Sequence, residues 1–164
     1  MKTYFVTLNY DYERILQMVE RETTEVGKRQ IDKDGNSLFE SLVLDEGYRD
    51  LTLAYMRRAS AVITDTLSAY IRHTPHSMYD QEVLDGANLN LCLEFPVTFP
   101  ETNVRTIDTA IYDYMVSYMC REWFMNKLPE VAEMYKIKED TAIGDIRHRL
   151  AMRKHVIQRP YKII

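Results

Sequence analysis

The sequence predicts a mainly α-helical protein, a bundle of about four principal helices with a small two-stranded β ribbon. Long segments carry apolar residues at spacings of three and four, which is the period of one helix face. Two short segments have the composition or alternation typical of strands. With 164 residues the chain is long enough to bury a sizeable core. We expect residues 1–164 to form a single helical domain, with 155–164 as a basic C-terminal extension.

The N-terminal segment predicts a strand followed by a helix. Residues 3–10 (TYFVTLNY) are rich in β-branched and aromatic side chains and partly alternate, which favours a strand. Asp11 then precedes a helical pattern whose apolar side comprises Tyr12, Ile15, Leu16, Val19, Thr23 and Val26. Gly27 is expected to end this helix as the residue after its last turn.

The segment 30–36 reads as a turn rather than a calcium loop. Asp34-Gly35-Asn36 is a turn by composition. If Gly35 is aligned with the invariant glycine of a calcium loop, Gln30 and Ser41 occupy positions where the loop needs an Asp and a bidentate Glu. Ser37 can then cap a short helix over residues 38–44.

A long helix is expected to open at Asp45 and to end near His73-Thr74-Pro75, because the residue before a proline avoids the helical region. Its predicted apolar stripe consists of Tyr48, Leu51, Tyr55, Ala59, Val62, Thr66 and Tyr70. Residues 76–88 follow as a polar loop.

The clearest strand covers residues 89–95, where Leu89, Leu91, Leu93 and Phe95 alternate with more polar residues. We expect it to pair with residues 3–9. A two-stranded ribbon is marginal alone and has to lie against helices.

From Asn103 onward the chain predicts two antiparallel helices joined by a short connection at Leu128-Pro129-Glu130. The first helix is marked by Ile107, Ile111, Met115, Tyr118 and Glu122, and the second by Val131, Tyr135, Ala142, Ile146 and Leu150. Gly144 leaves two alternatives, close packing on a neighbour or a local break. Trp123-Phe124 indicates core packing between the helices, with a surface anchor as the alternative.

Nothing in the sequence points to catalysis, a cofactor or a metal, and we expect no enzyme. No nucleophile elbow, Walker loop or dinucleotide motif occurs. Cys92 and Cys120 read as structural free thiols of a reducing compartment. His73 and His76, with Asp80 nearby, fall short of the ligands that zinc needs and read as surface residues. His148 and His155 extend a positive face.

Charge is unevenly distributed along the chain. The net charge is −4, and residues 145–164 carry +5, which leaves −9 on residues 1–144. The basic tail has three interpretations: a solvated helix end, a nucleic-acid contact, or a docking arm for an acidic groove, such as one on a neighbouring copy. As a docking arm, its candidate residues are Arg153, Lys154, Arg159, Tyr161 and Lys162.

A series of segments in this order resembles phage and prophage proteins of Bacteroides-type gut bacteria, virion components similar to the helical head–tail connector (adaptor) proteins of tailed phages. The segments are Thr24-Glu25-Val26-Gly27-Lys28, Ser37-Leu38-Phe39-Glu40-Ser41-Leu42, Asp50-Leu51, Tyr55-Met56-Arg57-Arg58-Ala59, Leu91-Cys92-Leu93-Glu94-Phe95-Pro96, Glu122-Trp123-Phe124, Glu130-Val131-Ala132-Glu133-Met134-Tyr135, Asp145-Ile146-Arg147, Arg153-Lys154 and Arg159-Pro160.

The resemblance implies a ring-forming structural protein without catalytic residues, whose partners are copies of itself and portal or tail subunits. It would reside in the bacterial host cytoplasm during assembly and then in the virion, without contact to a membrane. The alternative function is a small nucleic-acid-associated regulator, whose binding to duplex DNA would fall steeply with salt.

Overall fold

The computed structural model describes residues 2–32, 34–72 and 88–152. In these ranges the elements, in chain order, are β1 (Thr3–Asp11), α1 (Tyr12–Arg29), α2 (Phe39–Leu42), the 3₁₀ turn η1 (Glu46–Tyr48), α3 (Arg49–Thr66), β2 (Asn88–Pro96), α4 (Glu101–Phe124) and α5 (Pro129–Ala151). The four long helices and the two-stranded antiparallel sheet confirm the predicted fold class.

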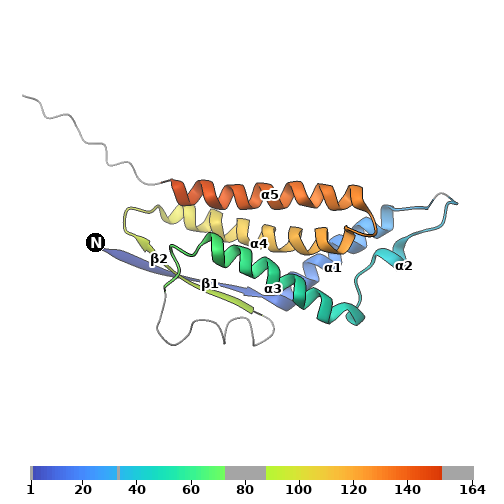
Figure 1. Ribbon diagram of the computed structural model, residues 1–164, viewed down its shortest axis with the longest axis horizontal. Helices are drawn as coiled ribbons and strands as arrows, with labels where there is room; N and C mark the ends of the chain where they lie inside the picture. The colour runs from blue at the N-terminus through green and yellow to red at the C-terminus, as the bar shows by residue number, and fades with distance from the viewer. Residues whose placement is uncertain (1, 33, 73–87, 153–164) are drawn as a thin grey trace, which may run out of the picture.

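Helices α4 and α5 form an antiparallel hairpin along one side of the molecule (Figure 1). A short connection joins them, and Pro129 occupies the first turn of α5, where its missing N–H has no helical partner to lose. The predicted reversal at Leu128-Pro129 is therefore confirmed.

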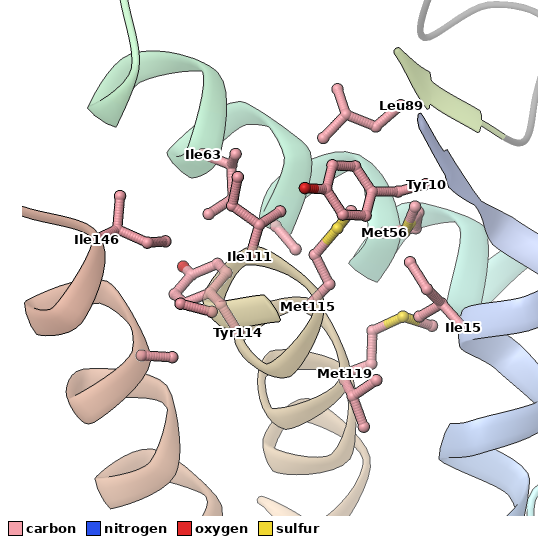
Figure 2. Packing of buried hydrophobic residues seen from close by; sticks show 14 of the residues in the cluster. Tyr10, Ile15, Met56, Ile63, Leu89, Ile111, Tyr114, Met115, Met119 and Ile146 are labelled. Atoms are coloured by element: carbon pink, nitrogen blue, oxygen red, sulfur yellow. The ribbon is translucent and has the colours of Figure 1, made fainter. Parts of the chain in front are cut away.

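Helix α4 is the centre of the core. Thirteen of its 24 residues are buried, more than on any other described element, and they point in several directions. Figure 2 shows Met115 and Met119 on the side of α4 that faces Met56 of α3 and Ile15 of α1, with Tyr114 on the side of Ile146 of α5. A helix that is apolar on more than one face has to be enclosed by its neighbours.

The ribbon covers another part of this core. β1 and β2 pair antiparallel from Thr3 opposite Pro96 to Asp11 opposite Asn88, and Leu89, Leu91, Leu93 and Phe95 are all buried. The sequence predicted this pairing, and the apolar face of β2 is buried because it packs in the same core as the helices. β2 is also bonded on its other edge, because Arg72 N donates to the Cys92 carbonyl at 2.9 Å and Glu94 N donates to the Tyr70 carbonyl at 2.7 Å.

The prediction for α3 was wrong in extent and in phase. The helix ends at Thr66, because residues 70–72 leave it to pair with β2. Of the seven residues predicted to form its apolar stripe, only Ala59 is buried; the buried set is Thr52, Met56, Ala59, Ser60 and Ile63. The predicted phase was wrong because two polar residues, Thr52 and Ser60, lie on the buried face of the helix. Thr52 Oγ1 forms a hydrogen bond of 2.6 Å with the Tyr12 hydroxyl.

Gly27 does not end α1, which continues to Arg29. It is buried against α2, where an added Cβ would lie 3.4 Å from Cδ2 of Phe39. The short helix is Phe39–Leu42, shorter than the predicted 38–44, although the Ser37 hydroxyl accepts a bond from Phe39 N at 3.2 Å as a capping residue would. Gly27 therefore serves helix packing.

The turn predicted at Asp34-Gly35-Asn36 is confirmed. Gly35 has a φ of +85°, which glycine adopts without strain. The Asp32 carboxylate accepts bonds from the backbone N–H groups of Asp34 and Asn36, at 2.8 and 2.7 Å. The bonds from Asn36 lower the pKa of Asp32 and tie its carboxylate into the turn.

Gly144 fits neither alternative raised by the sequence. α5 is continuous through it, and an added Cβ would meet nothing within 4 Å. We therefore predict that Gly144→Ala raises the free energy of unfolding by about 0.5–1 kcal/mol, because alanine favours the helix more than glycine does and its methyl group meets no neighbour. Urea unfolding followed by circular dichroism measures this change. The matched control is Gly35→Ala, which should lower the stability because residue 35 has a positive φ. A Gly144→Ala variant less stable than wild type would contradict the prediction.

Candidate functional site: a groove between α1, α4 and α5

An open groove of about 710 Å³ runs along α4 and is lined by residues of α1, α4 and α5. Its floor is made by small or medium apolar side chains, Ala110 and Val116 of α4 and Ala142 of α5, all of them buried. Ile137 of α5 lines one wall and is 61% exposed. An apolar floor with an exposed apolar wall is typical of a surface that binds another polypeptide.

The rim of the groove is charged. Three carboxylates line it, from Glu22, Asp113 and Asp145, together with the cations of Arg105 and Lys138. Within the described ranges neither Asp113 nor Asp145 forms an ion pair, so both carboxylates can accept a cation from outside. The third carboxylate is already engaged, because the Tyr135 hydroxyl donates to Glu22 Oε2 at 2.7 Å.

Tyr135 lines the groove and links α5 to α1. Its ring is stacked on Phe124, and Lys138 Nζ lies 4.7 Å from the ring centroid. Burial, followed by the neighbouring Cys120 and the bond to Glu22, raises the pKa of Tyr135. The hydroxyl therefore stays protonated and acts as a donor at neutral pH.

A second polar cluster lies near the α4–α5 reversal, where it holds the two helices together. Arg121 Nε donates to Glu139 Oε2 at 2.5 Å, and Arg121 Nη1 lies 2.8 Å from Glu122 Oε1. Lys136 completes the network with contacts to Glu139 at 3.2 Å and to Asp140 at 2.9 Å. The Glu139 side chain is only 7% exposed, so this is a largely buried ionic network.

The docking residues that the sequence predicted cannot be compared with this geometry, because they lie outside the described residues: Arg153, Lys154, Arg159, Tyr161 and Lys162. The same holds for His73, His76, Asp80 and His155. Within the described ranges no group of three His, Cys, Asp or Glu residues is arranged to hold a metal ion.

The other candidate residues are placed by the structure. Cys92 is half-buried in β2 and Cys120 is buried in α4, both as free thiols, and burial raises the pKa of Cys120. Trp123 and Phe124 are buried, and Trp123 Nε1 donates to the Leu42 carbonyl at 2.8 Å, which confirms core packing. His148 is exposed on α5.

The sequence analysis did not identify the groove or the ionic network. One signal for the network was present: Glu139 follows Tyr135 by four residues and therefore falls within the apolar stripe of α5. A carboxylate at such a position indicates a buried cation on the facing helix. The groove had no comparable signal, because it depends on how α1, α4 and α5 are placed in space.

Comparison of the chain with protein-family models, with curated proteins and with solved structures gave no significant match. Among the described helices, none combines the length and the hydrophobicity that a membrane span requires.

Loss of Arg121 should be strongly destabilising, because it leaves Glu139 buried with its charge only partly compensated. We predict that Arg121→Ala lowers the free energy of unfolding by about 3 kcal/mol, whereas the double variant Arg121→Met, Glu139→Leu recovers most of the loss. Urea unfolding of both variants tests this prediction. Lys28→Ala, which removes an exposed pair with Glu25, is the control and should have no measurable effect. An Arg121→Ala variant as stable as that control would show that the network contributes little.

Stability should fall at alkaline pH. Burial is the largest cause that raises the pKa values of Tyr10, Tyr114 and Tyr135 above the ordinary value of 10.0. The unfolded chain loses these protons near pH 10 while the folded chain keeps them, so this contribution to stability is complete below about pH 10 and declines above it. Urea midpoints measured between about pH 8 and pH 11 test the trend. Tyr135→Phe should give a shallower alkaline decline than wild type; an unchanged slope would contradict the assignment to Tyr135.

Proposed function

We propose that this protein is a non-enzymatic virion assembly protein of a phage or prophage, a head–tail connector subunit that forms a ring. Its partners are copies of itself and portal or tail proteins. It is made in the bacterial host cytoplasm and incorporated into the virion. The observation that carries the proposal is the separation of charge, with −9 on residues 1–144 and +5 on residues 145–164. Such a separation lets the two ends of identical subunits attract one another.

The base of the basic tail contacts the rest of the molecule through two long hydrogen bonds. The last turns of α5 are tied to the rest of the molecule, because Tyr70 Oη donates to the Leu150 carbonyl and Asn103 Nδ2 donates to the Arg149 carbonyl, each at 3.4 Å. Arg147 is exposed on α5 and forms no ion pair within the described ranges. The positive charge that is described in this region is therefore available to a partner.

The groove between α1, α4 and α5 is the best receptor for the tail of a neighbouring copy. Its apolar floor suits the aliphatic and aromatic side chains of the tail, and Asp113 and Asp145 suit its cations. Arm and receptor are different surfaces of one subunit, so the contact is heterologous and can close into a ring. Complementary charge guides encounter and register in such a contact more than it adds affinity.

Removing the tail tests the proposal. A chain ending at Met152 keeps every buried residue that the structure describes, so it should stay folded and should no longer form rings. Analytical ultracentrifugation and negative-stain imaging of the full and shortened chains measure assembly, and circular dichroism checks the fold. A shortened chain that assembles as the full chain does would rule out the tail as the docking arm.

Charge reversal in the groove separates the receptor from the arm. Asp113→Lys combined with Asp145→Lys should weaken ring formation at least about tenfold, because each cation of the tail then meets a like charge. Asp50→Lys combined with Asp65→Lys, at two exposed sites of α3 outside the groove, makes the same change in net charge and is the matched control. Equal effects of the two charge changes would point to net charge rather than the groove. Tail-dependent binding to duplex DNA that falls steeply with salt would instead favour the nucleic-acid-associated regulator.

A further inference from the structure

The chain leaves α5 on the side of the helix that lines the groove. Lys138 and Asp145 line the groove, and Met152, the last described residue, follows Asp145 at the same spacing that separates these two. Residues at this spacing of two turns lie on one face of a helix. Met152 is exposed and has an extended backbone, with φ −73° and ψ 103°, so the helix ends there. Residues 153–164 therefore begin on the groove side of α5.

These residues are numerous enough to reach the whole groove of their own chain. On α5 the residues that line the groove run from Asp145 back to Tyr135. Tyr135 lies about 25 Å before Met152 along the helix, at about 1.5 Å per residue. The segment 153–164 spans about 40 Å when extended, so it can turn back and still reach Tyr135.

We propose that residues 153–164 of the free subunit bind the groove of their own chain, and that assembly exchanges this own-groove contact for the same contact with a neighbouring copy. The inference rests on the proposed function, since it takes the groove as the site that binds the tail. A segment joined to its site by a short link has an effective concentration in the millimolar range. At micromolar concentrations the groove is therefore filled by its own tail, which keeps free subunits from assembling early.

Two carboxylates, one on each helix, line the groove at about the same level. The bonds that Asn103 and Arg121 donate to α5 set the relative level of the antiparallel helices α4 and α5. Interpolation between these bonds places Asp113 of α4 within about 3 Å of Asp145 of α5 along the helix axes. Neither carboxylate forms an ion pair within the described ranges, so a single cation between them satisfies both.

Arg159 is the cation that reaches this level. A turn of about four residues, 153–156, reverses the chain, and each extended residue then covers about 3.3 Å. The next three residues cover about 10 Å and end at Arg159. Asp145 lies about 10 Å before Met152 along α5, so the guanidinium of Arg159 arrives level with it.

The residues after Arg159 match the rest of the groove. Side chains alternate along an extended strand, so Ile163 faces the groove with Arg159, whereas Lys162 faces solvent. Ile163 lies about 13 Å beyond Arg159. At nearly the same distance, about 12 Å from Asp145 along α5, the groove has Ile137, whose side chain is 61% exposed. An isoleucine of the tail covers this apolar side chain.

The turn makes the own-groove contact weaker than the contact with a neighbour. Residues 153–156 (RKHV) contain no Gly, Pro, Asn, Asp or Ser, the residues that favour turns. A tail that enters a neighbouring groove does not need this turn, so the exchange removes its cost. The own tail therefore fills the groove in dilute protein, and the tail of a neighbour fills it where copies are concentrated.

A cysteine pair in the full chain tests the own-groove contact. Ile137→Cys with Ile163→Cys should form a disulfide within the chain on mild oxidation at low micromolar concentration, because the two residues lie level. Mass spectrometry of mixed isotope-labelled and unlabelled chains separates links within a chain from links between chains. Ile137→Cys with Lys162→Cys is the matched control and should give at least about fivefold less of this link, since residue 162 faces solvent. Wild type, whose thiols are buried or half-buried, gives the background.

Charge reversal tests the register. In the chain with the first cysteine pair, Arg159→Glu should lower the link within the chain at least about tenfold, because a carboxylate then meets Asp113 and Asp145. Lys162→Glu makes the same change in net charge and should leave the link unchanged. Equal effects of the two substitutions would overturn the register.

Blocking the turn tests the effect on assembly. Proline at Lys154, His155 and Val156 holds this segment extended, so the link within the chain should be lost. Rings should then form at a concentration at least about tenfold lower than for wild type, because the groove is no longer occupied. Serine at the same three positions allows the turn and is the matched control. A proline variant that assembles at the same concentration as the serine variant would overturn the control of assembly by the own-groove contact.

The outcomes separate this inference from the proposed function. Links only between chains, with loss of rings on tail removal, would overturn the own-groove contact and support docking between copies. Links within the chain, without rings in any variant including the proline variant, would support the own-groove contact and overturn the ring.

Discussion

The rest of the structure depends on the need to enclose α4. This helix is apolar on more than one face, and leaving it exposed would forfeit the burial that drives folding. Helices α1, α3 and α5 each cover part of α4, while the ribbon adds the alternating apolar face of β2 (Figures 1 and 2). The candidate functional surface follows from the same constraint, because the groove lies where α1 and α5 leave α4 incompletely covered.

Hydrogen bonds and an ion pair restrict the positions of the other elements around α4 more than its apolar side chains do. Leu is the commonest residue of the core, and the three buried methionines, Met56, Met115 and Met119, adapt to small shifts in packing. Tyr10 donates to Asp108 Oδ1 at 2.7 Å, Trp123 donates to the Leu42 carbonyl, and Arg121 contacts Glu139. Each of these bonds joins α4 to a different element and requires one position along the helix. Because an unmade bond would leave a buried polar group without a partner, shifted arrangements are disfavoured.

Local patterns in the sequence were sufficient to predict the fold class, β2 with its partner, and the α4–α5 reversal. Strict alternation identifies β2, and Leu128-Pro129 marks the break between two helical patterns. The phase of α3 could not be predicted, because Thr52 and Ser60 look like surface residues until Tyr12 and the core of the bundle are placed. The helix end expected at Gly27 was wrong for a similar reason, because the contact of this glycine with Phe39 depends on where α2 lies. The groove depends on long-range arrangement, which local periodicity does not encode.

The symmetry of the proposed tail docking restricts what it can build. Tail docking joins unlike surfaces, so it produces rings or open filaments according to the rotation between subunits. A ring closes only when a whole number of these rotations completes a full turn. Closure would strengthen a weak contact, because every copy in the ring then engages both its tail and its groove.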